Sequence, residues 1–254
     1  GTIATMKMER AMLRLSSGLR INGAADDAAG LAVATTMRSQ LRGMNMSIRN
    51  SSDAIGLIQT AESGMNTVSA IVLRMRELSV QMNNGIYTTS DRANASSEFN
   101  ALRNEITKIA TYTSFNSTTI LSGGIDTTMR AGDTNTQTIA VTVDSVLPTA
   151  LSISSITLAT LANAASSVTA LDGALSALAG FQAELGALQN RFQHNIDNLT
   201  KGAMYTEQAI GRIIDADFAV ETSELSKQQI LGQAATAMLA QANQSKQSVL
   251  QLIQ

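Results

Sequence analysis

IGLIQTAESGMNTVSAIVLRMRELSVQM, residues 55–82, is the stretch that decides the fold. Small and aliphatic residues recur in it at alternating spacings of three and four, which is the pattern of a heptad seam on an α-helix. If the chain is helical from about residue 45 to residue 83, this element spans on the order of 60 Å. We therefore expect an elongated molecule built from long helices. The seam positions are Ile58, Ala61, Met65, Val68, Val72, Met75, Ser79 and Met82.

Two more helices are predicted to pack against this one. Asn83-Asn84-Gly85 ends the first helix, and the polar run 88–91 offers caps for a second helix that carries Phe99, Leu102, Ile106 and Ile109. The second half of the chain repeats the seam pattern in a third long helix. The sequence thus predicts a mainly α fold, an antiparallel helical bundle or coiled coil formed by the N- and C-terminal halves. The seam of the third helix is Leu171, Leu175, Leu178, Phe181, Leu185, Leu188, Phe192 and Asn195.

The C-terminal segment carries a seam that needs a partner. The start of the chain, Met6 to Leu15, supplies only part of one. The rest of the apolar surface is therefore expected to pack against neighbouring molecules. The residues predicted to make these inter-subunit contacts are Leu231, Ala235, Met238, Ala242, Val249 and Leu252.

The middle of the chain, about residues 116–167, changes character. Ser, Thr, Gly and Asp dominate it, and Ile139, Val141 and Val143 alternate with polar or small residues, which is the period of a half-exposed strand. The run 132–135, Gly-Asp-Thr-Asn, is typical of a turn. We expect a small β-hairpin inserted between the helical halves.

The composition argues against several classes of partner. Lys and Arg total 18 against 20 Asp and Glu, and no segment concentrates the basic residues, so neither nucleic acid nor an anionic membrane is expected to bind. No apolar run approaches the roughly 18 residues that span a bilayer, so no membrane insertion is expected. Residues 1–14 lack the pattern of a cleavable secretory signal. The protein either stays inside the cell or leaves by another route.

No residue pattern supports catalysis. His194 is the only histidine and the chain has no cysteine, which removes most metal sites and nucleophilic triads. Neighbouring Asp26 and Asp27 point about 100° apart on a helix, so they are interpreted as helix caps, and Asp215 and Asp217 have the same interpretation. We expect no enzyme activity and no catalytic, cofactor-binding or metal-binding residues.

Motifs at both ends carry a specific resemblance. The first are LSSGLRIN at 15–22 and DDAAG at 26–30; RMRELSVQ at 74–81 and TSFN at 113–116 follow; the last are ALQNRF at 187–192, DAD at 215–217, QIL at 229–231 and LAQANQ at 239–244. Together they resemble the bacterial flagellins over nearly the whole chain, in a short form with little or no outer variable domain.

The resemblance implies two domains. Residues 1–28 with 214–254 would form the terminal coiled-coil domain that lines the filament, with a short N-terminal stretch of the family missing before Gly1. Residues 29–213 would form the helical core domain with its hairpin region. The implied function is a structural filament subunit that is secreted by the flagellar type III apparatus, self-assembles through its terminal helices and stays on the extracellular surface.

The resemblance also implies partners: other filament subunits in a homopolymer, an export chaperone, the filament cap and an innate immune receptor. Arg74, Leu78 and Glu98 match the family's receptor-contacting surface. Two other functions remain open at this point, a hook–filament junction protein and a flagellin-like surface protein that binds an extracellular ligand such as a polysaccharide. An enzyme inserted in the middle segment is disfavoured because that segment holds no histidine.

Overall fold

The computed structural model describes residues 2–253, with side chains from residue 3 to residue 246. In this described part the chain forms five helices and four short strands, which confirms the mainly α fold with a small β insertion. It divides into two compact units, a terminal unit (residues 1–42 and 202–254) and a central unit (residues 43–201). Two long helices, α2 (Ala28–Met82) and α4 (Leu161–Ile214), contribute to both units.

The terminal unit contains α1 (Thr2–Ser17) and α5 (Phe218–Ile253) together with the start of α2 and the end of α4. Ile21, Ala34, Ile210 and Ile214 form a buried cluster in it. Because Ala34 and Ile210 lie within α2 and α4, this packing extends the unit past the divisions expected at 28/29 and 213/214, to 42/43 and 201/202.

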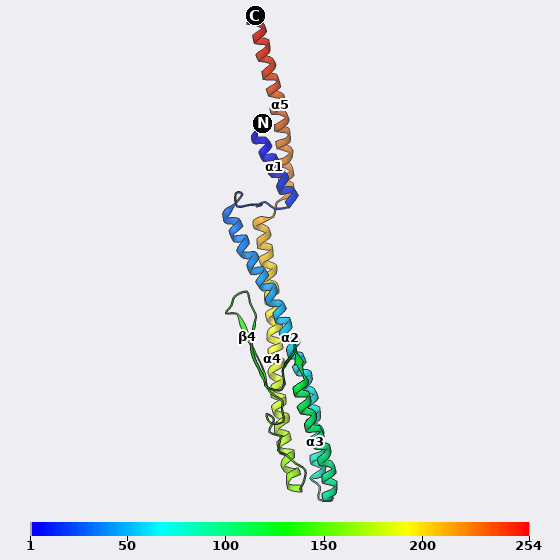
Figure 1. Ribbon diagram of the computed structural model, residues 1–254. Coiled ribbons are helices and arrows are strands. Elements are labelled where there is room, and N and C mark those ends of the chain that lie inside the picture. Colours follow the sequence, from blue (N-terminus) through cyan, green and yellow to red (C-terminus); the bar gives the residue numbers. More distant parts are fainter. Residues whose placement is uncertain (1, 254) are drawn as a thin grey trace. The chain divides into compact units, whose positions relative to one another are not determined.

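The central unit is an antiparallel helical bundle. Going forward along α2, Ser51, Asn66 and Arg76 hydrogen-bond to residues that lie progressively earlier in α4; these partners are Asn195, Gln182 and Asp172. The third helix, α3 (Thr89–Tyr112), turns back after α2 and lies beside it (Figure 1). The predicted hairpin of helices after Asn83-Asn84-Gly85 is thus present.

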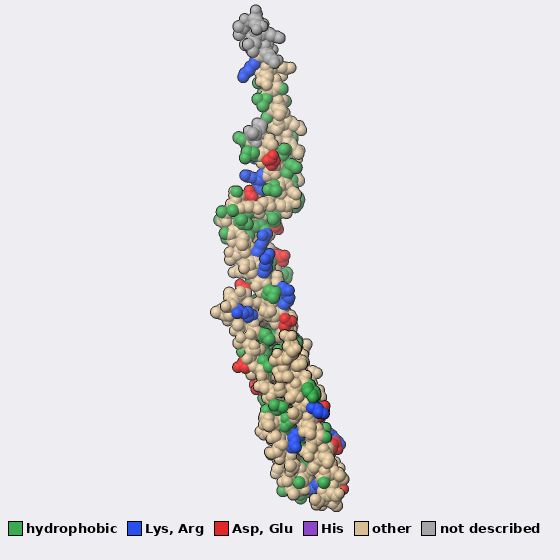
Figure 2. Space-filling view, viewed as in Figure 1, with side chains coloured by type: hydrophobic (Ala, Val, Ile, Leu, Met, Phe, Trp, Pro, Cys, Tyr) green, Lys and Arg blue, Asp and Glu red, His purple; other side chains and the backbone are tan. Residues whose placement is uncertain are grey.

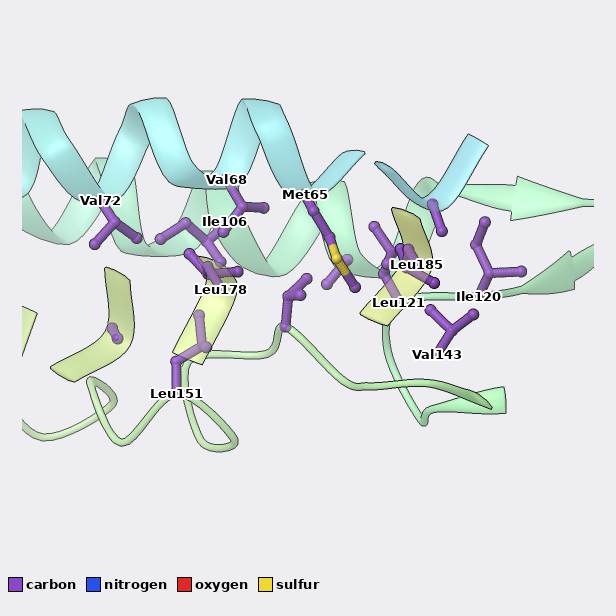
Figure 3. Close-up of a cluster of buried hydrophobic side chains, with 14 of the residues drawn as sticks. Met65, Val68, Val72, Ile106, Ile120, Leu121, Val143, Leu151, Leu178 and Leu185 are labelled. Carbon is purple, nitrogen blue, oxygen red and sulfur yellow. The ribbon is translucent and has the colours of Figure 1, made fainter. Parts of the chain in front are cut away.

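The predicted seam on α2 forms the core of the central unit. All eight of its positions, from Ile58 to Met82, are buried. Figure 3 shows Met65, Val68 and Val72 pointing from α2 toward side chains of α3, α4 and the connecting segments. On α4 the seam alternates between buried and partly buried positions: Leu171, Leu178, Leu185 and Phe192 are buried, and Leu175, Phe181 and Leu188 are packed at the edge. The spacing of apolar residues therefore located this core.

α2 begins earlier than the seam predicted. It starts at Ala28 rather than near residue 45, and its 55 residues span about 80 Å. Asp27 caps its first turn, since the backbone N–H of Gly30 donates to Asp27 Oδ1 at 2.8 Å. The heptad pattern missed the first turns because they pack in the terminal unit, around Ala34, and not in the central core.

α3 begins with a capping box. The Asp91 N–H donates to Thr88 Oγ1 at 3.3 Å, and the Thr88 N–H donates back to Asp91 Oδ2 at 2.9 Å. These hydrogen bonds, first that from the Thr88 hydroxyl and then that from its backbone N–H, lower the pKa of Asp91 below its ordinary value. The ionised carboxylate, which accepts both bonds and favours a helix N-terminus, therefore persists to lower pH than that of an ordinary aspartate.

The middle segment forms the predicted hairpin and a smaller second one. β3 (Ile125–Arg130) pairs antiparallel with β4 (Thr138–Val143), and Ile139, Val141 and Val143 face the core as their alternation indicated. β1 (Ser114–Phe115) pairs with β2 (Thr118–Thr119) through a two-residue turn at Asn116 and Ser117, which both have positive φ. Sequence reasoning missed this turn because Asn-Ser is a weaker hairpin signal than Asn-Gly.

The turn of the larger hairpin is attached to both long helices. The Ser47 hydroxyl of α2 donates to the Gly132 carbonyl at 2.7 Å, and the Asn195 side chain of α4 donates to the Ala131 carbonyl at 2.9 Å. Asn195 is the last position of the predicted α4 seam, so its polar side chain has a defined role. It satisfies a carbonyl of the buried residue Ala131 that would otherwise cost free energy.

α4 is long and rich in apolar residues. By length and composition it could cross a membrane, and it is the one helix in the described part of the chain of which this is true, contrary to the expectation from the sequence. Leu171, Leu178, Leu185 and Phe192 of this helix lie in the core of the central unit, whereas Leu161 and Met204 are exposed. Packing between helices accounts for the buried ones.

Candidate assembly interface

α1 and α5 form the close helix pair of the terminal unit. Their backbones approach within 8 Å, and Arg14 Nη1 lies 2.9 Å from Glu221 Oε1. Ala4 and Thr5 at the beginning of α1 line the same groove as Gly232 and Thr236 of α5, so the two helices run antiparallel. In Figure 1 α1 lies beside the first part of α5. The N- and C-terminal segments therefore pair, as their patterns predicted.

A short backbone link holds the two helix junctions of this unit together. Leu19 and Asp215 form an antiparallel bridge, and the Arg20 N–H donates to the Ile214 carbonyl at 2.6 Å. Gly18, at φ 70°, turns the chain after α1 through a left-handed conformation that favours glycine. Asp217 then caps α5 by accepting from the Ala219 N–H at 2.9 Å. The predicted capping role thus holds for Asp217, whereas Asp215 belongs to the bridge.

The contact between α1 and α5 is made by small and polar residues. Ala11 of α1 is buried there, together with Glu221 and Gln228 of α5. Gln228 donates to Glu224 at 2.6 Å, and this hydrogen bond is the main cause that lowers the pKa of Glu224 below its ordinary value. An ordinary two-helix coiled coil places its large apolar side chains at this position. Here the contact uses few of them.

Most of the large apolar side chains of the pair point outward instead; Met8, Leu15 and Leu225 are partly buried. Figure 2 shows hydrophobic side chains on the surface of this part of the molecule. We call this set the apolar face, meaning the exposed large apolar side chains on all outer sides of the pair; it consists of Ile3, Met6, Met12, Leu13, Phe218, Val220, Ile230, Leu231, Met238 and Leu239. Ile3, Met6 and Leu13 also line an open groove on α1, whose other walls carry charged side chains such as Lys7 and Asp26. Such a concentration of exposed apolar residues is typical of an interaction surface.

The structure brings only some of the predicted inter-subunit residues to the surface. Leu231 is 47% exposed, Met238 is 70% exposed and Ala242 is exposed, whereas Ala235 is partly buried beside α1. The side chains of Val249 and Leu252 lie outside the described residues. Sequence reasoning did not predict the α1 members of the face. Their helical spacing, three residues from Ile3 to Met6 and seven from Met6 to Leu13, extends over too few turns to stand out.

The three residues proposed for receptor contact do not share one surface. Arg74 Nη2 lies 3.0 Å from Glu98 Oε1 and Arg74 Nη1 lies 3.1 Å from Glu77 Oε2, so an exposed ion-pair cluster joins α2 to α3. Hydrogen bonds from Arg74 to Glu77 and then to Glu98 raise the pKa of Arg74 further above its ordinary value. Leu78, however, is 4% exposed and belongs to the core. Leu78 is therefore buried in the single chain, and its part in receptor contact stays a prediction.

The residues considered for catalysis have structural places. His194 is exposed on α4, and Asp27 caps α2. Asp26 accepts from the Asn22 N–H at 3.1 Å in the loop before α2. Within the described residues, no group of three or more His, Asp or Glu side chains is placed to hold a metal ion.

Comparison with known proteins gives a consistent result. The bacterial flagellin N-terminal helical region matches residues 2–126, and the bacterial flagellin C-terminal helical region matches residues 157–253. A flagellin of Halalkalibacterium halodurans is 44% identical over 250 residues, covering 96% of this chain and 91% of that protein. A flagellin of Bacillus subtilis is 39% identical over 282 residues, covering 96% of this chain and 92% of that protein.

A solved structure supports the same relationship. The crystal structure of Bacillus cereus flagellin aligns with a TM-score of 0.52 at 28% identity, over 59% of this chain and 88% of that chain. The two matched regions cover both helical halves and leave only the hairpin segment between them. The chain therefore belongs to the bacterial flagellins.

Proposed function

We propose that this flagellin builds its homopolymer by burying the apolar face of α1 and α5 against neighbouring copies of the same chain. Flagellins are the structural subunits of the bacterial flagellar filament, and this chain is one of them. The proposal concerns which surface makes the contact. The observation that carries it is the polarity of the helix pair, with Ala11, Glu221 and Gln228 inside and the large apolar side chains outside.

The energetics favour a partner that covers this face. Complete burial of one Leu, Ile, Val, Phe or Met side chain contributes about 1.5–3 kcal/mol, and the face has ten such residues. These side chains point to several sides of the helix pair, so covering them takes several neighbouring copies, each packed side by side against it. Because every copy carries the same face, the contacts can repeat along a filament.

The same surface supports the remaining partners. An export chaperone would have to cover the apolar face before assembly, and a filament cap would contact it as each subunit is added. We therefore extend the proposal to a subunit that is secreted through the flagellar export apparatus and meets both partners on its way into the extracellular filament. Supporting this extension are the exposed Ile230, Leu231 and Met238, which the chain itself leaves uncovered.

The double substitution Leu231→Asp with Met238→Asp tests the proposal. Both residues lie on one stripe of α5, so two charges are placed where a neighbouring copy would bury them, and we expect polymerisation to be lost while the monomer stays helical. Sedimentation and electron microscopy after salt-induced polymerisation measure the loss of polymer, and circular dichroism measures the helical content of the monomer.

A matched control uses Gln59→Asp with Asn94→Asp. Both residues are exposed in the central unit and neither belongs to the apolar face, so the added charge is equal but lies outside the proposed contact. We expect this control to polymerise. Equal loss in both double variants would point to added charge alone, and unimpaired polymerisation of the Leu231 and Met238 variant would refute the proposed contact.

A second proposal concerns the immune receptor. We propose that Arg74 and Glu98 contribute to its contact surface, supported by their exposed ion pair across α2 and α3, while Leu78 only packs beneath them. Arg74→Ala and Glu98→Ala should each weaken receptor signalling in a cell-based reporter assay. Arg76→Ala is the control, since Arg76 instead pairs with Asp172 of α4. Signalling unchanged in Arg74→Ala and Glu98→Ala would end this idea.

A further inference from the structure

Methionines in this protein range from buried to exposed. Three are buried (Met65, Met75, Met82), four are partly buried (Met8, Met37, Met44, Met129) and five are exposed (Met6, Met12, Met46, Met204, Met238). The chain has 12 methionines, no cysteine and no tryptophan, so methionine is its main side chain for reaction with a mild peroxide. Met65, Met75 and Met82 lie in the buried seam of α2. Met6, Met12 and Met238 belong to the apolar face and are 65%, 53% and 70% exposed.

Exposure decides which of them a peroxide reaches. The thioether sulfur needs no ionisation to react: it takes one oxygen atom from hydrogen peroxide, a sulfur–oxygen bond forms, the oxygen–oxygen bond breaks, and water leaves. The sulfur is oxidised by two electrons and the peroxide is reduced by two. A buried sulfur reacts only when the protein opens, so Met65 and Met75 are expected to react far more slowly than Met6 or Met238.

The product changes the chemistry of the apolar face. A sulfoxide is polar and accepts hydrogen bonds, whereas the thioether it replaces is a flexible apolar group. Met6 neighbours Ile3 and Leu13 in the groove on α1, and Met238 is followed directly by Leu239 on α5. A neighbouring copy that buries these groups would have to bury unpaired sulfoxide oxygens with them, which opposes association.

We infer that Met6, Met12 and Met238 form an oxidation site that controls assembly: a peroxide converts them to sulfoxides in the free subunit and blocks its addition, while the assembled polymer protects them. The inference rests on the proposed function, because it needs the apolar face to be the contact between copies. The free subunit is thus the vulnerable form. Assembly and oxidation compete for the same three side chains.

The experiment compares oxidation before and after assembly. Full-length chain is treated with hydrogen peroxide either free or as polymer, and peptide mass spectrometry measures sulfoxide at each methionine. In the free chain we expect Met6, Met12 and Met238 to be oxidised well before Met65, Met75 and Met82, which serve as internal buried controls. In the polymer, oxidation of the first three should fall at least tenfold.

Assembly of the oxidised chain is the second measurement. Peroxide treatment should raise the concentration of free subunit that remains after polymerisation by at least tenfold, which equals about 1.4 kcal/mol. Methionine sulfoxide reductases with a dithiol should restore the original value by returning each sulfur to the thioether, with water and a disulfide of the reductant as the other products.

Leucine variants assign the effect to residues. A triple variant with Met6→Leu, Met12→Leu and Met238→Leu keeps the apolar volume and should polymerise equally well with or without peroxide. Met46→Leu removes an exposed methionine of the central unit and should leave the peroxide effect unchanged. A triple variant that stays sensitive, or treated wild-type chain that polymerises normally, would overturn the inference.

The outcomes separate this inference from the proposed function. If untreated chain forms no polymer, or if its polymer leaves the three methionines as reactive as in the free chain, then the apolar face is not the contact and the proposed function fails. If the polymer protects them but prior oxidation does not hinder assembly, only the oxidation control fails.

Discussion

A chain that ends at Glu224 is expected to stay folded and to lose polymerisation completely. Neither buried apolar cluster of the described residues includes a member from 225–254: the larger belongs to the central unit, and the smaller consists of Ile21, Ala34, Ile210 and Ile214. The truncation keeps the Asp217 cap and the Arg14–Glu221 ion pair. It removes Ile230, Leu231, Met238 and Leu239 from the apolar face.

Two measurements check this expectation. Thermal unfolding followed by circular dichroism should show a midpoint close to that of the full chain, because the core of the central unit is intact. Sedimentation after addition of a precipitating salt should show no polymer at concentrations where the full chain assembles. Filaments formed by the truncated chain would show that the part of α5 after residue 224 is dispensable and would contradict the proposed division of labour.

The core of this protein was predictable because its cause is periodic. A helix that buries one stripe repeats its apolar residues every three or four positions, and that period is visible in residues 55–82 without any structure. The same reasoning located the buried face of α4 and the inward side of β4. It did not locate the start of α2, since the turns after Ala28 pack elsewhere and follow no long repeat.

The candidate interface was predictable only in outline. The sequence indicated that α5 is apolar and lacks a sufficient partner. It did not indicate which residues of α5 are buried and which are exposed. Gln228 is buried and Ile230 is exposed, which reverses the order that side-chain polarity alone suggests. That partition depends on where α1 lies along α5, and the Leu19–Asp215 bridge that links the two helix junctions joins residues far apart in the sequence. The burial of Leu78 was not predictable for a related reason, because a resemblance in sequence carries no information about burial.

Phe192→Ala is expected to cause the largest loss of stability among single substitutions in the helical core. Phe192 is fully buried on α4 and is one of the two largest such side chains in the described residues, with Phe99. Its removal leaves a cavity between helices that close-packed neighbours cannot fill, at a cost of about 3–5 kcal/mol in the free energy of unfolding. Urea unfolding of the full chain, followed by circular dichroism, measures this as a lower midpoint with an unchanged slope.

Phe181→Ala is the matched control on the same helix. Phe181 occupies the same seam but is only partly buried, so its truncation removes fewer contacts and leaves a space that water can enter. We expect its cost to be clearly smaller, and we expect Phe192→Leu to fall between wild type and Phe192→Ala because leucine fills part of the volume. An equal loss at both positions would mean that the seam is uniformly packed, against the alternation of buried and partly buried positions along α4. Since the apolar face contains no residue of this seam, subunits of all three variants should still polymerise at temperatures where they remain folded.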